Sequence, residues 1–450
     1  MSLIKRSQQI LILSTLFFLP FYFIKFKHDW ISLSLVEILV IALFLVWFSN
    51  KEIKYAIRYT QYAIPTALII TGLILSILIN KNYYVGLGIL KGWFVLPIIF
   101  AVILYNNLKK DEKLLDRVFV VLFASGAFTA IEGIYYWLFG LLAYDGRLRI
   151  FFDSPNQLAM FLAPAFLIGL IKFGESLALM NCPDLVGARE KPSFGKKAEL
   201  WEKYFAIVGM LLISFNLYLT KSYGAWLAIG LVLMIVFWLK YRKLWPIKYL
   251  AITIIILIIF IAAASFGKFE NIKKLGERSS LASREMIWKS AGLMIEKNPV
   301  LGIGPGNFQE KYLEYQKYFP PYLEWAVPQP HNLYLAFWLE SGLAGLAGFF
   351  WVVWLFFKDN KKIYPLTKIS EHHNALVHKT KKQTQESPSE KNNFGEGARD
   401  FYGSIFLAII LYFLIHGLVD TTYWRNDMAV IFWTIVAVNL FLAEKRLEKN

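Results

Sequence analysis

The chain has 450 residues, of which 57% are hydrophobic and 18% are charged, and its formal net charge is +16. This composition excludes an ordinary water-soluble domain, whose surface needs more charge. The apolar residues form continuous runs, which favours membrane-spanning helices over a β-barrel. The positive charge is therefore interpreted as a membrane-topology signal, and no nucleic-acid partner is expected.

The apolar runs predict an all-α fold, a polytopic membrane helix bundle of about twelve transmembrane helices within a single membrane domain, residues 1–450. A run of about 20 apolar residues is the length that a helix needs to cross the hydrocarbon core. The expected spans are 10–25, 31–49, 62–80, 85–105, 118–142, 156–173, 204–220, 224–239, 249–266, 333–357, 403–419 and 428–443.

Lysine and arginine in the short connections predict the orientation, because cytoplasmic loops are rich in these residues. The loop that holds Lys240, Arg242 and Lys243 is the clearest cytoplasmic marker. Both termini and residues 174–202 are expected in the cytoplasm, and the active face is expected outside. Residues 358–402 are predicted to be a disordered cytoplasmic loop, because they are rich in polar and charged residues.

The first span follows two basic residues, Lys5 and Arg6, so a cleaved signal peptide is one interpretation of it. No small-residue cleavage site follows, and the chain leads directly into another span. A retained anchor is therefore the preferred interpretation.

The long connection 267–331, between the ninth and tenth spans, is predicted to be an external helical cap. A helix is expected to begin at Ser283, as its N-cap, and to end near Asn298, before Pro299. A glycine-rich turn and a second helix, at about 307–318, should follow. One face of the first helix is expected to be apolar, because apolar residues recur along it at spacings of three and four: Ile287, Trp288, Ala291 and Ile295. Arg284 lies at the end of this apolar face.

His331 immediately precedes the tenth span and is a candidate general base. The partial positive charge of a helix N-terminus favours a neutral imidazole, which can accept a proton from an alcohol. The alternative interpretation is a histidine that caps the helix or lies at the membrane interface.

Several cations are expected at the external face and are candidates for binding a diphosphate, an anion that arginine binds well. Ordinary loop charges and side chains that extend to the membrane interface are the alternative interpretation. The candidates are Arg147, Arg149, Lys221, Arg278, Arg284, Arg425 and, inside the fourth span, Lys91.

Three acidic residues, Glu37, Glu132 and Glu340, lie within spans and are interpreted either as a proton path or as partners of buried cations. The sequence contains no external Asp-x-Asp pair and no histidine or cysteine cluster at zinc spacing. Metal-independent chemistry without a cofactor is therefore expected.

Several short motifs resemble those of the O-antigen ligase and O-antigen polymerase superfamily of bacterial membrane proteins. The matching elements are His331-Asn332 with Gly342 and Gly345, Ser283-Arg284 with Trp288, the stretch from Leu301 to Phe308, Gly146-Arg147, Asp153 to Ala159, and His416 to Asp420 with Trp424-Arg425. The resemblance runs from about 146 to 425, with an O-antigen ligase-like core at about 205–356.

The resemblance implies an inverting glycosyltransferase of the bacterial inner membrane. Such an enzyme moves a glycan from a polyprenyl-diphosphate carrier to a glycolipid or other acceptor. His331 and Arg284 are the implied catalytic residues. The implied substrate-binding residues are Arg147, Lys221, Lys91, Asn332, Arg278 and Arg425.

One position departs from the family pattern Thr-x-Ser-Arg-Gly. This chain has Thr220-Lys221-Ser222-Tyr223-Gly224, with Tyr223 at the arginine position. Lys221 supplies a charge two residues away, but without the two-pronged geometry of arginine. Polymerisation of lipid-linked repeats and a transporter similar to the branch once linked to bicarbonate uptake therefore remain alternatives.

Overall fold

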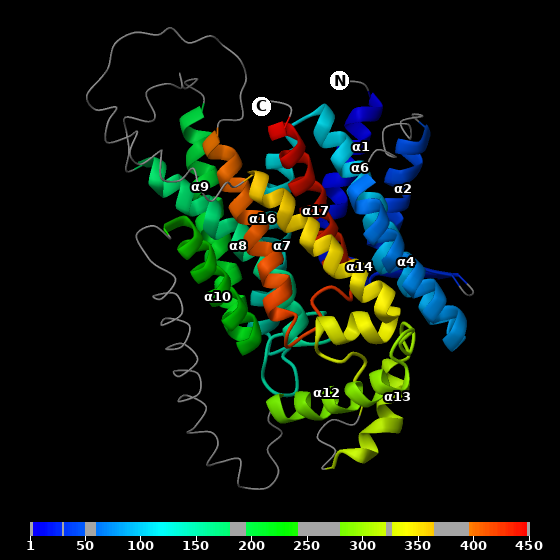
Figure 1. Ribbon diagram of the computed structural model, residues 1–450. Coiled ribbons are helices and arrows are strands. Elements are labelled where there is room, and N and C mark those ends of the chain that lie inside the picture. Colours follow the sequence, from blue (N-terminus) through cyan, green and yellow to red (C-terminus); the bar gives the residue numbers. More distant parts are fainter. Residues whose placement is uncertain are drawn as a thin grey trace.

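The computed structural model describes residues 3–28, 31–49, 60–180, 195–241, 280–320, 326–363 and 396–447. Within these residues the secondary structure is helical apart from one short β-hairpin, and turns and loops join the elements. The long helices form one bundle, and the two cap helices, α12 and α13, lie across one end of it (Figure 1). Both termini lie at the opposite end of the bundle.

The bundle helices are α1 Leu3–Phe17, α2 Leu35–Ser49, α4 Thr60–Asn80, α5 Tyr83–Ile89, α6 Leu96–Lys110, α7 Leu114–Leu138, α8 Pro155–Met180, α9 Gly195–Thr220, α10 Tyr223–Tyr241, α14 Leu333–Ile363, α16 Glu396–His416 and α17 Asn426–Leu447. The cap contains α12 Ser280–Lys297, α13 Phe308–Tyr315 and the short helix η4 Gln316–Tyr318. The remaining elements are the short helix η1 Leu19–Phe23, the π-helical segment η2 Leu90–Val95 and the strands β1 Lys25–His28 and β2 Ile31–Ser34.

The predicted membrane helix bundle is confirmed, because five helical segments in the described part of the chain are long and apolar enough to cross a membrane: Gln61–Asn80, Tyr83–Lys110, Leu114–Leu138, Leu333–Lys361 and Asn426–Leu447. Shorter apolar helices overlap the predicted spans 31–49, 156–173, 204–220, 224–239 and 403–419. The ninth span, 249–266, lies outside the described residues. The number of twelve spans stays a prediction.

Several helices extend beyond the predicted spans. Helices α8 and α9 extend into the predicted loop 174–202, and α14 and α16 extend into 358–402. Helix α1 ends at Phe17 and α2 begins at Leu35, because the chain forms η1 and the hairpin β1–β2 between them. In this hairpin polar and apolar residues alternate with the period of a strand, a pattern that a continuous apolar run does not contain.

Helix α14 is broken at Gly342, where the backbone adopts φ +65° and ψ −172°. The glycine-rich turn of the cap fits against this break. The backbone N–H of Ile303 donates to the carbonyl of Leu339 at 2.6 Å, and that of Leu343 donates to the carbonyl of Val300 at 2.8 Å. The break therefore provides backbone groups that attach the cap to the bundle.

Helices α4 and α14 pack closely through small residues. A Cβ atom on Gly72 would lie 2.4 Å from the carbonyl oxygen of Ser341 and 2.7 Å from the backbone nitrogen of Gly345. Glycine is required at position 72 because the two backbones approach this closely, which is typical of helix pairs in membranes.

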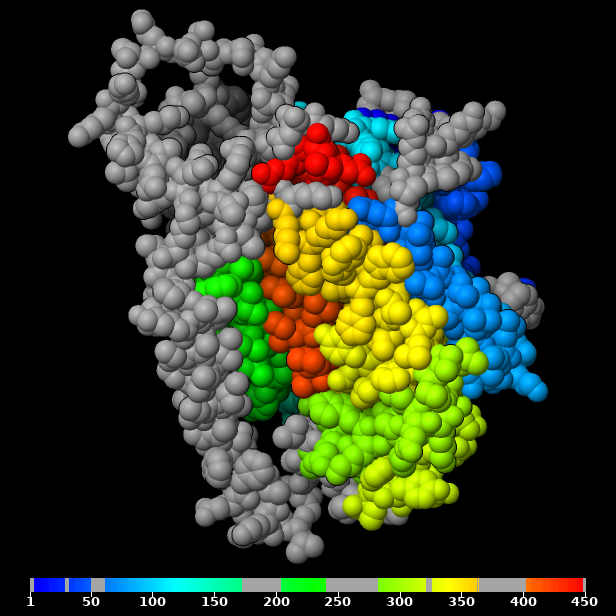
Figure 2. Space-filling view, in the orientation of Figure 1, coloured from blue at the N-terminus to red at the C-terminus, as the bar shows by residue number. Residues whose placement is uncertain are grey.

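The cap has its own apolar core, which includes Ile287, Ala291, Phe308 and Tyr312 and reaches Leu339 of α14. Figure 2 shows the cap residues in contact with the first part of α14. The predicted apolar face of the first cap helix and the end of that helix before Pro299 are confirmed. The predicted N-cap is wrong, because the helix begins at Ser280 and Ser283 is buried inside it.

Candidate active site

His331 lies two residues before α14, with its backbone in the left-handed region at φ +46°. Asn332, and not His331, caps the helix: its side-chain oxygen accepts hydrogen bonds from the backbone N–H groups of Tyr334 and Leu335 at 3.0 and 2.9 Å. The imidazole is therefore available for another role, and its side chain is 34% exposed.

The segment that carries His331 is joined to the loop 417–425, which connects α16 and α17. The backbone N–H of Leu333 donates to the carbonyl of Gly417 at 2.7 Å, and the Asn332 amide donates to the carbonyl of Leu418 at 2.9 Å. These hydrogen bonds fix the His331 segment relative to the loop.

Helix α12 of the cap contacts the same segment. The indole N–H of Trp288 donates to the carbonyl of Pro330 at 3.1 Å and lies 3.4 Å from that of His331. Arg284 lies one helical turn earlier on the same helix face. The cap therefore holds the histidine backbone with one side chain and brings a cation to the site with another.

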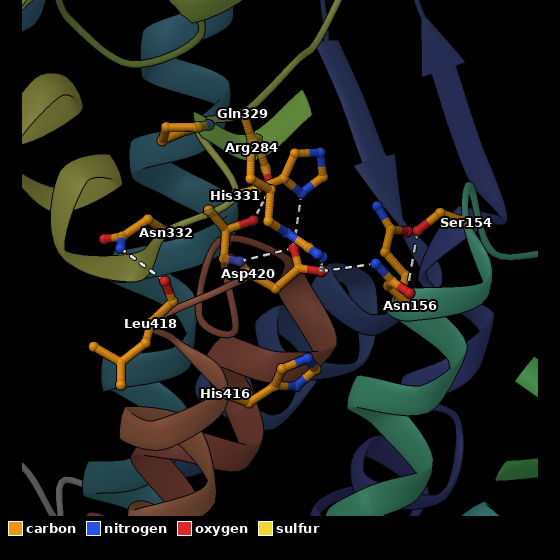
Figure 3. Close-up of polar contacts among 12 residues, drawn as sticks. Ser154, Asn156, Arg284, Gln329, His331, Asn332, His416, Leu418 and Asp420 are labelled. Carbon is orange, nitrogen blue, oxygen red and sulfur yellow. Dashed lines mark hydrogen bonds and ion pairs between the residues drawn. The ribbon is translucent and has the colours of Figure 1, made fainter. Parts of the chain in front are cut away.

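Asp420 is the centre of this cluster (Figure 3). Its buried carboxylate accepts from the backbone N–H of Thr421 at 2.9 Å and lies 3.1 Å from His331 Nδ1. Its second oxygen accepts from the Asn156 amide at 3.2 Å and lies 3.9 Å from Arg284 Nη2. Four segments distant in sequence thus meet at one carboxylate.

The environment of Asp420 keeps it ionised. Burial by itself would raise the pKa of this carboxyl, but the charge and hydrogen bond of His331, with His416 and Arg284, hold the pKa below its ordinary value. A carboxylate can only accept hydrogen bonds. His331 Nδ1 therefore carries the hydrogen, and Nε2 of a neutral ring is the nitrogen that can accept a proton.

Asn156 reaches the cluster from the start of α8. Ser154 precedes Pro155, the first residue of the helix, and its hydroxyl accepts from the backbone N–H of Gln157 at 3.3 Å. This is the expected order of an N-cap followed by proline. The helix start fixes the direction of the Asn156 side chain toward Asp420.

Three of the other predicted cations form ion pairs with carboxylates. Lys91 Nζ lies 3.2 Å from Glu37, and the partly exposed Arg147 lies 2.6 Å from Asp145. Arg425 is buried in an ion pair with Asp427 at 2.6 Å. Burial by itself would lower the pKa of Arg425, but Asp427 raises it above its ordinary value, so the group stays charged. None of these ion pairs includes His331, Arg284 or Asp420.

The remaining predicted residues lie at the edge of the site or outside the described chain. Lys221 is exposed in the turn between α9 and α10, with φ +48°. Tyr223 is 62% exposed, and Gly224 beside it lies near His416 and Val419, at the end of α16 and in the loop that carries Asp420. Arg278 lies outside the described residues.

The membrane acids have different surroundings. Glu37 pairs with Lys91, as one of its two interpretations predicted. Glu340 is buried and accepts from the backbone N–H of Gly306 at 3.4 Å, so it contacts the glycine-rich turn of the cap.

Sequence reasoning missed Asp420 and Asn156 as site residues. Both lie in stretches that carry the family resemblance, and each side chain contacts a group more than 80 residues away in the chain. A signal was present, because each is a polar residue in a turn next to an apolar span. The sequence did not indicate that the two turns meet.

The arrangement provides a base and a cation at one place. His331 Nε2 can take a proton from a hydroxyl while Asp420 stabilises the imidazolium that forms. Arg284, 16% exposed beside the same carboxylate, can face an anion. A reaction that transfers a group to an alcohol and releases an anion requires both a base and a cation of this kind.

Residues 208–350 match the family model described as O-antigen ligase. The match covers less than half of the chain and includes Arg284 and His331, while Asn156 and Asp420 lie outside it. The resemblance identified from the sequence is confirmed over this region. No curated protein matches the chain.

Proposed function

We propose that this chain, which carries an O-antigen ligase domain at residues 208–350, transfers a glycan from a polyprenyl-diphosphate carrier to an acceptor hydroxyl at the cap end of the bundle. The observation that carries the proposal is the contact of His331 Nδ1 with Asp420, 3.1 Å, with Arg284 beside the same carboxylate. The domain match supports a membrane enzyme of the ligase and polymerase type.

The first step of the proposed reaction is activation of the acceptor. His331 Nε2 accepts the hydroxyl proton as the acceptor oxygen attacks the anomeric carbon. Asp420 holds the ring in the tautomer that leaves Nε2 unprotonated, and it stabilises the charged ring afterwards. General-base catalysis of this kind contributes about 10²- to 10⁴-fold in rate.

The second part is departure of the diphosphate. The bond between the anomeric carbon and the phosphate oxygen breaks as the new glycosidic bond forms, and the electron pair leaves with the diphosphate. Arg284 stabilises the developing charge, and a donor placed in this way is worth about 3–4 kcal/mol. A single displacement inverts the anomeric centre.

The test is reconstitution of the purified protein with a lipid-linked glycan and two acceptors, a glycolipid core and a second lipid-linked glycan. Transfer to the glycolipid with an inverted anomeric bond is the expected result. Extension of the second lipid-linked glycan instead would identify a polymerase, which uses the same residues. No transfer to either acceptor would overturn the proposed function.

A further inference from the structure

The hairpin β1–β2 projects from the side of the bundle (Figure 1). Its two strands are antiparallel, with Lys25 opposite Ser34 and Lys27 opposite Ser32. Because side chains alternate across a strand, the two lysines share one face and Phe26 lies on the other, opposite Leu33. The hairpin is therefore amphipathic, with a basic face and an apolar face.

The basic face is exposed and has no carboxylate partner in the described part of the chain. All four residues of β1 are exposed, and neither Lys25 nor Lys27 forms an ion pair within the ranges that the structure describes. Two residues of a strand span about 7 Å, and two flexible lysine side chains at that spacing on one face can both reach a single diphosphate.

The base of the hairpin is held by a polar cluster around Glu37. Glu37 accepts from the backbone N–H of Ser34 at 2.7 Å and pairs with Lys91 at 3.2 Å. Lys91 also donates to the carbonyl of Ser32 at 2.7 Å. Among the described residues, Glu37 thus pairs with Lys91 and with neither strand lysine.

The segment before the hairpin packs on the element that enters the candidate active site. The rings of Phe23 and Phe151 lie 4.4 Å apart, and the guanidinium of Arg425 lies over the rings of Tyr22 and Phe152. Phe151 and Phe152 lead directly to Ser154 and Asn156 of the site. The two strands also run beside this part of the site in Figure 3.

Exposed apolar side chains accompany the lysines, namely Phe23, Ile24 and Phe26 at 41%, 36% and 57% exposure. Lysines next to exposed aromatic residues are typical of segments at a membrane interface. A ligand with an anionic head and a hydrocarbon chain fits this surface, with its head at the lysines and its chain in the surrounding lipid.

We propose that the hairpin face formed by Lys25 and Lys27 binds the diphosphate of the incoming lipid-linked donor before the donor reaches Arg284. This rests on the proposed function, which names the donor class. Two lysines match the charge of a diphosphate better than that of a single phosphodiester, and the hairpin adjoins the site. These features favour the donor over the bulk phospholipid as the occupant.

The test uses the full-length protein in nanodiscs of zwitterionic phosphatidylcholine that contain a fluorescent polyprenyl diphosphate without glycan. The Lys25→Gln/Lys27→Gln variant should bind this probe about tenfold more weakly. In transfer assays its KM for the donor should rise by a similar factor while kcat is unchanged. Lys25→Arg/Lys27→Arg should bind as the wild type does. Lys289→Gln/Lys311→Gln, which changes two exposed cap lysines, is the matched control.

Equal probe binding by the wild type and the Gln/Gln variant would overturn the proposal. The proposal would also be overturned if phosphatidylglycerol displaced the probe as effectively as unlabelled polyprenyl diphosphate does. The surface would then be a general phospholipid site. If the protein binds the probe through the two lysines but transfers no glycan, the docking site is supported. Only the proposed function is then contradicted.

Discussion

The indole of Trp288 donates its hydrogen bond to the carbonyl of Pro330 at 3.1 Å, which ties the cap to the residue before the candidate base. Trp288→Phe removes this donor and keeps an aromatic ring in the cap core. We expect kcat to fall roughly 10- to 100-fold, because a small displacement of a catalytic group is costly, with little change in thermal stability.

Trp338→Phe is the matched control, because that indole N–H also donates to a proline carbonyl, that of Pro299 at 2.7 Å, away from His331. Both variants are compared by steady-state transfer kinetics and by thermal unfolding in detergent. An equal effect of the two changes on kcat would show that Trp288 has no specific role in placing His331.

Asp420 fixes the tautomer of His331, so Asp420→Asn should reduce kcat about 10²- to 10⁴-fold. The amide can also donate, and it no longer compels Nδ1 to carry the hydrogen. Donor affinity should change little. Asp145→Asn, which changes a carboxylate paired with Arg147, should retain near-normal turnover. Comparable kcat values for the two variants would contradict the assigned role.

The ionised state of Asp420 also predicts a pH dependence of stability. Its folded pKa is lowered, so its stabilisation is fully present above the ordinary aspartate pKa of about 3.9 and is lost as the pH falls through the folded value. The difference in melting temperature between the wild type and Asp420→Asn should shrink as the pH falls below about 4. A difference that grows below about pH 4 would mean that the pKa is raised.

Asn332 was predicted to bind substrate, and in the structure it caps α14. Asn332→Ala should therefore lower the free energy of unfolding by about 1 kcal/mol. Asn332→Asp keeps the capping oxygen and should recover most of that loss. If Asn332→Asp is stable but has a strongly raised KM for the donor, direct substrate binding by Asn332 is supported instead.

The orientation of the bundle is tested by single-cysteine labelling after replacement of the natural Cys182. The cap residue Lys289 and Lys113, between α6 and α7, are suitable sites because both side chains are exposed. An impermeant reagent applied to intact cells should label Lys289→Cys and not Lys113→Cys. The reverse pattern would invert the predicted topology.

The sequence predicted the parts of the site that local pattern determines. Spacing along one helix placed Arg284 and Trp288 on the same face, and the proline before the tenth span placed His331 at its start. The contact of His331 with Asp420 joins two loops 89 residues apart, and nothing local to either loop specifies it. Predicting that contact requires the packing of α14 against α16 and α17.

The fold, too, was predictable where the local sequence pattern determines it, and was not predictable where contacts between distant residues do. Apolar runs located the helices, and Pro299 correctly marked the end of α12. The hairpin was missed because Lys25 and Lys27 interrupt the apolar pattern at a period of two. The pairing of Lys91 with Glu37 was one of two interpretations, and the choice depended on how α2 packs beside η2.

The most direct test of the central claim is the turnover of the His331→Ala variant in the reconstituted transfer assay. Donor binding is measured on the same preparation. The account predicts that transfer falls about 10²- to 10⁴-fold, because the base is lost, while the lipid-linked donor still binds. Near-wild-type transfer by a folded His331→Ala protein would contradict the account, since no proton acceptor would then be required at this position.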